Sequence, residues 1–339
     1  MKKTAIYSAI LFLFATILVI YAPKEALSQT TKGMKWRIQS TYSPTSHVTR
    51  QLTWWADEVN KRTGGKINFE ILPINMLFKS AEAFESVADG VAEGTLCSLH
   101  YDAGKLPEGD VGWAPCIWTA KEYIKIWTET EYLNILNEAM AKFNLHQISV
   151  IGSGAFPLIS NFPLNKLDDF KGKRIRALGV EADFIKTFGA APVNIIPAEL
   201  YTALQRGTMD GIFWPVYVLK DYKFWEVCKY VAMLNIHDNV EVDLYFNLKS
   251  FNSLPKDVQK IMKEVGKELV GRAAKIGEEM NNAIVEEAKA KGVNIIYPTK
   301  GMERIFTDGA KPFWEQAASK SPQCRKLTDI ILRVKGEKK

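Results

Sequence analysis

Two arginines in a short predicted strand carry the chemistry that is easiest to recognise in this sequence. Alternation over residues 173–178 places Ile175 and Ala177 on one face of the strand, and Arg174 and Arg176 on the other. A guanidinium is a planar fork that can donate two parallel hydrogen bonds to the two oxygens of a carboxylate. From the pattern alone, an exposed strand arginine is the simpler interpretation, and a carboxylate clamp is the alternative.

The sequence carries no recognisable catalytic constellation. Its four histidines are scattered singly, and the metalloprotease, nucleophile-elbow, Walker and dinucleotide-binding motifs are absent. We therefore expect a protein that is not an enzyme, with no catalytic residue, no cofactor and no metal ion. A periplasmic enzyme acting on organic acids is the alternative of another class, and an input module of a sensor is a third hypothesis.

Length and composition indicate an ordinary folded chain with two domains or one large one. The 339 residues are 47% hydrophobic and 24% charged, and the net charge of +6 is spread without a run of like charges. A nucleic-acid partner is therefore not expected. The aromatic share, 11% of the chain, is slightly high.

Residues 1–28 have the pattern of a secretory signal peptide. A basic start precedes an uncharged, almost wholly apolar stretch over 5–20, and small residues at Ala26 and Ser28 predict cleavage before Gln29. An uncleaved N-terminal anchor is the alternative, because the apolar stretch is nearly long enough to cross a membrane. In both cases we expect the rest of the chain to be exported.

Export places the four cysteines in an oxidising compartment, where disulfides can form. Four cysteines allow three pairings, and the sequence does not choose among them. Buried free thiols are equally compatible with it. No two cysteines form a C-x-x-C motif, so neither a redox nor a zinc role is expected for Cys97, Cys116, Cys228 and Cys324.

Strands and helices alternate along the mature chain in two groups. The first group comprises strand 35–40, helix 46–62, strand 67–71, helix 84–91 and strand 95–99. The second group comprises strands 147–152 and 173–178, helix 181–188, strand 192–196, helix 198–205 and strand 209–214. This rhythm predicts two α/β units, each with a parallel sheet flanked by helices. Two such units predict two lobes, with a ligand cleft at the carboxyl ends of the strands.

Residues 255–291 have the pattern of one very long helix. An apolar stripe recurs at helical spacing, and Pro255 suits the first turn. Its length of about 54 Å, at 1.5 Å per residue, exceeds one small lobe, so the helix could brace both. Gly266, Gly271 and Gly277 weaken it, and a break into two helices is the alternative.

A series of short motifs in the middle of the chain is more specific than any single residue. Lys-Gly-Lys-Arg-Ile-Arg at 171–176 is followed by Phe-Gly-Ala-Ala-Pro-Val at 188–193, by Glu-Leu-Tyr-Thr-Ala-Leu-Gln-Arg-Gly at 199–207 and by Asp-Gly at 210–211. In this order and spacing, the series resembles the solute-binding proteins of tripartite ATP-independent periplasmic (TRAP) transporters, the DctP family. The likeness extends over about residues 35–320.

The resemblance implies an α/β, two-lobed periplasmic binding protein fold, with a central ligand cleft and a long helix spanning both lobes. It implies a periplasmic protein that captures a small organic acid by cleft closure and delivers it to the membrane subunits of a TRAP transporter. The expected parts are lobe I over 35–150, with contributions from about 240–255 and the C-terminal region, lobe II over 151–239, the bridging helix over 255–291, and a C-terminal strand and helix over 292–339.

Arg176 matches the arginine with which members of this family grip the ligand carboxylate, so the resemblance favours the clamp. Trp214 stands where several members have an asparagine, and Phe156 stands where sialic-acid-type members have a second arginine. Aromatic side chains at both places would suit an aryl or indolyl monocarboxylate, or they would simply fill the interface between the lobes. An aliphatic 2-oxo or hydroxy acid or a sugar acid is the alternative ligand. The weaker candidate ligand-binding residues are His47, Tyr101, Phe213, Tyr217 and Glu241, together with Tyr42 and His100.

Overall fold

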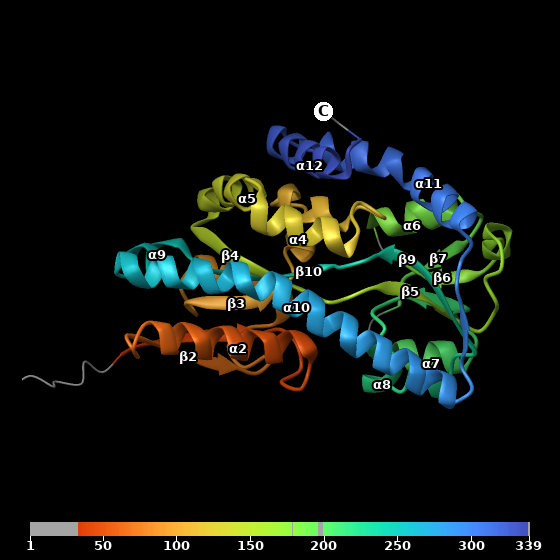
Figure 1. Cartoon of the computed structure of the whole chain (residues 1–339), viewed down its shortest axis with the longest axis horizontal. Helices are drawn as coiled ribbons and strands as arrows, with labels where there is room; N and C mark the ends of the chain where they lie inside the picture. The colour runs from red at the N-terminus through yellow and green to blue at the C-terminus, as the bar shows by residue number, and fades with distance from the viewer. Residues whose placement is uncertain (1–32, 178, 196–198, 338–339) are drawn as a thin grey trace, which may run out of the picture. The chain divides into compact units, whose positions relative to one another are not determined.

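Two β-sheets and the helices packed on them make up most of the described part of the chain (Figure 1). The computed structural model describes residues 33–177, 179–195 and 199–337, and the chain from Lys35 onward forms one compact unit. The predicted signal peptide lies outside the described residues. Within the described ranges, no helix is both long enough and apolar enough to cross a membrane.

The first sheet combines strands from the N-terminal part of the chain with one strand from much later. Its strands are β1 (Met34–Ser40), β2 (Ile67–Leu72), β3 (Gly94–Cys97), β4 (Leu145–Gly152) and β10 (Glu241–Asn247). Their order is β2-β1-β3-β10-β4. β1 and β3 run parallel, whereas β10 is antiparallel to both of its neighbours.

The second sheet is built mainly from the middle of the chain. Its strands are β5 (Phe156–Ser160), β6 (Arg174–Arg176), β7 (Ala191–Val193), β8 (Gly211–Phe213), β9 (Tyr230–His237) and β11 (Asn294–Ile296). Their order is β11-β9-β5-β8-β6-β7. β8, β6 and β7 run parallel, as do β11 and β9, while β5 is antiparallel to both β8 and β9.

Helices connect the strands and cover the sheets. Those before the long helix are α2 (His47–Arg62), α3 (Ala83–Ala88), α4 (Ala120–Glu129), α5 (Tyr132–Met140), α6 (Gly179–Lys186), α7 (Leu200–Gln205), α8 (Val218–Asp221) and α9 (Leu248–Ser253). The C-terminal helices are α11 (Lys300–Ala318) and α12 (Pro322–Lys335). α11 packs on α6, which precedes β7 of the second sheet, and α12 packs on α4 and α5. The C-terminal segment therefore contacts elements from both halves of the fold.

The chain crosses between the two sheets at two points that lie side by side. β4 leads into β5 through 153–155, and β9 leads into β10 through 238–240. The backbone N–H of Ser153 donates a hydrogen bond to the Val240 carbonyl at 3.0 Å, and the Ser153 hydroxyl donates to the same oxygen at 3.2 Å. These hydrogen bonds hold the two crossings, which we call the paired crossings, next to each other.

The long helix α10 (Lys256–Ala290) is unbroken over 35 residues. At 1.5 Å per residue it is about 52 Å long, and it packs on β4 and α2 at one end and on α8 and β11 at the other (Figure 1). The alternative of a break at its glycines is therefore wrong. Gly266 instead allows close packing, because a Cβ there would lie 2.8 Å from the Ile148 carbonyl oxygen of β4.

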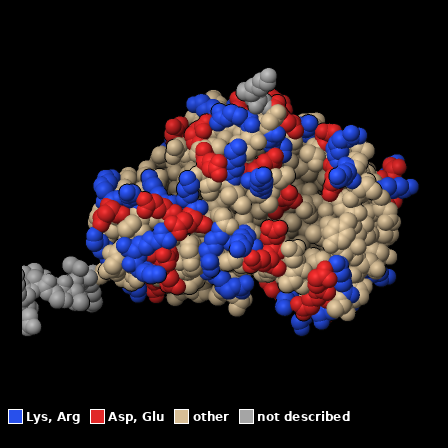
Figure 2. Space-filling view, in the orientation of Figure 1, with Lys and Arg blue, Asp and Glu red and all other residues tan. Residues whose placement is uncertain are grey.

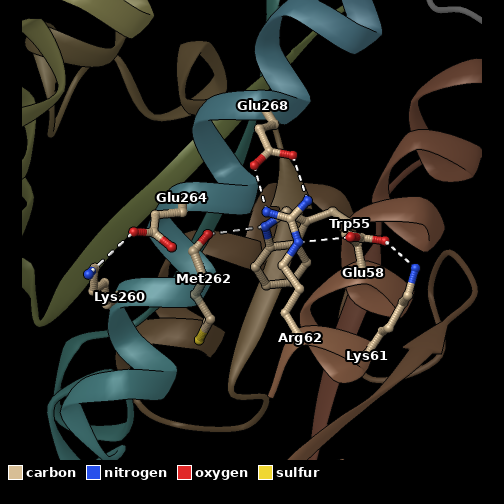
Figure 3. Close-up of polar contacts among 8 residues, drawn as sticks. All are labelled: Trp55, Glu58, Lys61, Arg62, Lys260, Met262, Glu264 and Glu268. Carbon is tan, nitrogen blue, oxygen red and sulfur yellow. Dashed lines mark hydrogen bonds and ion pairs between the residues drawn. The ribbon is translucent and has the colours of Figure 1, made fainter. Parts of the chain in front are cut away.

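Polar contacts fasten the N-terminal half of α10 to α2 (Figure 3). The Arg62 guanidinium donates to the two carboxylate oxygens of Glu268 at 2.6 and 2.7 Å, and to Glu58 at 2.8 Å. The Trp55 indole N–H donates to the Met262 carbonyl at 3.3 Å. Trp55 is fully buried and ties the helix to the core, whereas solvent-exposed ion pairs such as those of Arg62 contribute little to stability on their own.

Charges of both signs lie close together on the surface. Figure 2 shows basic and acidic side chains intermingled on the viewed face. Many are neighbours on one helix, such as Lys186 with Asp183 at 2.9 Å and Lys289 with Glu286 at 2.6 Å. This face therefore offers no continuous basic stripe of the kind that binds a polyanion.

The strongly periodic elements lie close to where the sequence predicts them, but the sheets are mixed and not wholly parallel. The sequence pattern does not predict β5, β9 or β10. β10 is buried along its whole length, yet it carries Glu241, Asp243 and Asn247 on one face. Polar side chains at these positions hide the apolar run that identifies a central strand.

Candidate ligand-binding site

A cavity of about 130 Å³ lies between the two sheets, where β1, β3, β6 and β8 reach their carboxyl ends. Ligands of α/β proteins bind at such strand ends. The cavity is lined from both sheets by Tyr42, His100, Tyr101, Trp113, Ser153, Phe156, Arg176, Glu181, Phe213, Trp214, Pro215, Tyr217, Val240 and Val242.

Two larger hollows, of about 480 and 510 Å³, lie against α10. Their basic side chains, which include Lys263, Lys267 and Lys275, are exposed to solvent. Water already solvates such groups, so they gain little from a ligand. The smaller cavity differs because it contains a partly buried cation.

That cation is Arg176, the last residue of β6. Its Nε is buried and has no hydrogen-bond partner among the described residues. Burial lowers the pKa of this guanidinium from its ordinary value, although an arginine stays cationic at neutral pH all the same. Arg174, on the same strand face, is instead satisfied by Asp210 through contacts of 2.8 and 3.1 Å. The Arg174 guanidinium is thus paired with Asp210, whereas the Arg176 guanidinium keeps a donor for a ligand.

Glu181 reaches the cavity from the first turn of α6. Its Oε1 lies 2.7 Å from Nε2 of His237, which donates to it. Burial on its own would raise the pKa of the Glu181 carboxyl. The hydrogen bond from His237, together with nearby positive charge that includes Arg176, outweighs burial and lowers the pKa below its ordinary value. Glu181 therefore presents an anion to the cavity.

His100 enters the cavity after β3 and is oriented by Asp110. Its Nδ1 lies 2.6 Å from one carboxylate oxygen of Asp110, and Lys320 donates to the other oxygen at 2.6 Å. Burial would raise the pKa of Asp110, but these two contacts lower it below its ordinary value. Because a carboxylate only accepts, His100 donates this hydrogen bond from Nδ1.

Aromatic rings form much of the remaining wall. Trp113 stacks on His100 with ring centroids 4.3 Å apart. It also meets Phe156 and His237 edge-on, at 6.4 and 5.8 Å. The Trp113 indole N–H is buried and has no partner among the described residues. This wall gives the charged groups surroundings of low polarity, in which their interactions are stronger than in water.

Most of the residues expected from the sequence come together here. The cavity is lined by Arg176, Phe156, Trp214, Phe213, Tyr101 and Tyr217, and by the weaker candidates Tyr42 and His100. Tyr101 is 62% exposed, so it lies where the cavity meets solvent. That these residues contact a ligand remains a prediction.

His47 does not line the cavity. It is the first residue of α2, it is buried, and its Nε2 lies 3.6 Å from the place of a Cβ on Gly277 of α10. Burial, together with the charge of Arg50, lowers the pKa of His47 to about 4. The ring is therefore neutral at pH 7 and packed between two helices.

Glu241 is also outside the lining. Its neighbours Val240 and Val242 contact the cavity, and strand alternation turns Glu241 to the other side of β10. There it packs so closely against Gly112 that a Cβ on that glycine would overlap the carboxylate. Burial raises the pKa of the Glu241 carboxyl well above its ordinary value.

The sequence pattern does not single out Trp113, Glu181 or Ser153. Trp113 ends a 3-10 segment, Pro107–Trp113, that has no helical or strand periodicity. Glu181 has the signal that could have found it, because it opens a helix directly after the strand that carries Arg176. Ser153 belongs to a crossing whose existence depends on both sheets.

The cysteines are free thiols, which decides between the two alternatives that the sequence leaves open. Burial raises the pKa of Cys97, Cys116 and Cys228 to about 12. Among the residues that the structure describes, no cluster of three or more His, Cys, Asp or Glu side chains could hold a metal ion.

Known proteins of similar sequence cover most of this chain. The family model for the bacterial extracellular solute-binding proteins of family 7, DctP, matches residues 38–321. A solute-binding protein of Albidiferax ferrireducens is 27% identical over 277 residues, which make up 80% of this chain and 82% of that protein. The sialic acid-binding periplasmic protein SiaP of Vibrio cholerae is 24% identical over 267 residues, 77% of this chain and 81% of that protein.

A solved structure shows the same fold. The TRAP periplasmic solute-binding protein of Rhodoferax ferrireducens with bound malonate has a TM-score of 0.78 and 24% identity, over 89% of this chain and 98% of that chain. The resemblance drawn from the sequence motifs and the two-lobed α/β fold with a bridging helix are thereby confirmed. The family model describes bacterial extracellular solute-binding proteins, and the two relatives named with a ligand bind sialic acid and malonate. The chain belongs to the DctP family of bacterial extracellular solute-binding proteins.

Proposed function

We propose that this protein captures a small monocarboxylate in the cavity between its sheets and delivers it to the membrane subunits of a TRAP transporter. The observation that carries the proposal is the Arg176 guanidinium, whose Nε is buried at the cavity without a partner among the described residues. A carboxylate matches this group because its two oxygens accept two parallel charge-assisted hydrogen bonds. The described lining contains no lysine and no second arginine, which favours one clamped carboxylate over two.

The volume of the cavity favours a small ligand. It is about 130 Å³, and an apolar cavity of about 150 Å³ holds one benzene molecule. A short aliphatic acid fits this volume best, whereas an aryl, indolyl or sugar acid would need a wider cavity. Rings such as Phe156 and Trp214 offer flat faces that suit an aryl acid. The ligands named for the relatives, malonate and sialic acid, are also carboxylates.

Capture would work by closure of the two lobes around the ligand. Tyr42 and His100 line the cavity from the first sheet, and Arg176 and Trp214 from the second. A ligand that contacts both sides stabilises the closed arrangement, because only a difference in affinity between two states shifts their populations. The paired crossings are where the backbone would bend. Cleavage of the signal peptide before Gln29 would release the protein into the periplasm.

A thermal-shift screen of the purified mature protein tests the proposal. A ligand at a hundredfold excess over its Kd stabilises the folded state by about 2.7 kcal/mol, so a true ligand raises the Tm by several degrees. Aliphatic and aryl monocarboxylates should do so, and calorimetric titration should confirm one binding site. If only dicarboxylates or sugar acids raise the Tm, the monocarboxylate assignment is wrong. If no acid raises it, the capture of an organic acid is wrong as well.

A further inference from the structure

Two side chains of opposite charge line the cavity without pairing with each other. Arg176 ends β6, and Glu181 lies in the first turn of α6. No ion pair within 4.0 Å joins them among the described residues, yet each lies near enough to affect the pKa of the other. The two groups therefore line the same cavity without an ion pair between them.

Glu181 is held in one orientation. Its Oε1 accepts the hydrogen bond from His237 at 2.7 Å. His237 is 3% exposed and is packed against the rings of Trp113 and Phe156, at 5.8 and 5.6 Å. The second carboxylate oxygen of Glu181, Oε2, has no hydrogen bond to a described residue. The carboxylate is thus fixed with one acceptor position left at the cavity.

We propose that Glu181 selects, among small carboxylic acids, those that carry a hydrogen-bond donor beside the carboxylate, either a hydroxyl or an ammonium group. This inference rests on the proposed function, in which Arg176 clamps the carboxylate of the ligand. With the acid group on Arg176, the substituent next to it faces the space toward Glu181. An ionised carboxylate can only accept hydrogen bonds, so the substituent that completes the site is a donor.

The alternatives leave a polar group unsatisfied. An unsubstituted acid satisfies Arg176 but offers no donor to Oε2 of Glu181. A 2-oxo acid places a carbonyl oxygen, which is another acceptor, against the carboxylate. The expected order of affinity is therefore donor-bearing acid, then unsubstituted acid, then 2-oxo acid.

Matched acids test this order on the wild-type protein. One set is lactate, alanine, propionate and pyruvate, and the other is 3-phenyllactate, phenylalanine, 3-phenylpropionate and phenylpyruvate. A hydrogen bond to a charged group is worth about 10- to 100-fold in affinity. We expect a hydroxy or amino acid to bind at least about 10-fold more tightly than the 2-oxo acid of the same skeleton, as measured by calorimetric titration. Comparison within each set shows whether the donor is hydroxyl or ammonium.

Glu181→Gln isolates the selecting group. The amide keeps the size of the side chain and can still accept from His237, but it can also donate to a carbonyl. The preference for the donor-bearing acid over the 2-oxo acid should fall at least about 10-fold, with the 2-oxo acid gaining affinity. Asp183→Asn is the matched control, because Asp183 is an exposed residue of the same helix and pairs with Lys186. That variant should keep the wild-type order.

The outcomes separate this inference from the function on which it rests. Equal binding of the members of each set by the wild type overturns the role of Glu181 and leaves carboxylate capture standing. The same holds if Glu181→Gln binds acids in the wild-type order. If none of the eight acids binds to the wild type, the proposed function fails and the inference fails with it.

Discussion

Replacing Arg176 by alanine should separate ligand binding from folding. In the proposed complex, the guanidinium donates two hydrogen bonds to the ligand carboxylate. Hydrogen bonds that involve a charged group contribute about 1.5–3 kcal/mol each, so their loss corresponds to a rise in Kd of roughly 10²- to 10⁴-fold. Arg176→Lys keeps the positive charge but loses the two parallel donors, so its Kd should lie between that of Arg176→Ala and that of the wild type.

The stability of the ligand-free protein, in contrast, should not fall when Arg176 is replaced by alanine. Nε of Arg176 is buried without a partner among the described residues, and burial lowers the pKa of the group. Removal of a desolvated, unpaired cation relieves a cost, so the Tm of the ligand-free protein should stay the same or rise. Arg174→Ala is the control on the same strand. It breaks the exposed pair with Asp210 at 2.8 Å, so it should lower stability only slightly and leave binding unchanged.

Titration calorimetry with the acid that gives the largest thermal shift measures the first effect, and scanning calorimetry without ligand measures the second. A Kd for Arg176→Ala within about threefold of the wild type would refute the clamp. A fall in Tm that exceeds the effect of Arg174→Ala would show that Arg176 supports the fold. In that case its partner lies within the protein, and the reasoning from its buried, unpaired Nε is wrong.

Other substitutions test the packing and the buried ionisable groups. Gly266→Ala should lower stability by about 1–3 kcal/mol, because the new Cβ would lie 2.8 Å from a backbone oxygen. Gly271→Ala should raise stability by up to about 1 kcal/mol, because a Cβ there has nothing within 4 Å. Thermal unfolding of both variants compares the two effects. The pKa of His47 is lowered to about 4 in the folded state, so the unfolded chain takes up the proton first and stability falls as the pH drops from about 6.5 towards 4, by up to about 3 kcal/mol. His47→Leu should flatten the dependence of Tm on pH in that window, and an unchanged slope would contradict this account. Burial raises the pKa of Glu241, so its ionisation in the unfolded chain lowers stability as the pH rises above about 4.3. Glu241→Gln should therefore raise the Tm at pH 7.5, with a smaller difference at pH 5.

Local pattern is enough to find Arg176 but not Glu181. Arg176 stands in a strand with clear alternation and within a run of motifs that occur together in one family. The role proposed for Glu181 depends on its bond to His237, which lies at the end of a strand far along the chain. Two residues that are unremarkable in the sequence acquire a joint role only when β6 and β9 enter the same sheet.

The same distinction separates the elements that the sequence predicts from those it does not. The periodicity of α10 is local, so its span could be read within a residue or two. The function of Gly266 could not, because it depends on the distance from the helix to β4. His47 lies in an expected helix, but the sequence does not show where the first turn of that helix points its side chains. Glu241 lies in β10, a strand that the pattern does not predict, so its direction could not be read either.

Selectivity and closure follow from the same groups in this site. Arg176 and Glu181 both lie on the second-sheet side, so a ligand bound to them alone would stabilise open and closed states equally and would cause no movement. The contacts that favour closure must come from the first-sheet side, where His100 and Trp113 meet the cavity. Trp113 packs against His237, the residue that holds Glu181, as well as against His100. In the proposed mechanism, this aromatic contact would couple Glu181 to the first-sheet side, so an acid that fails to satisfy Glu181 would also lose part of the energy that closes the protein.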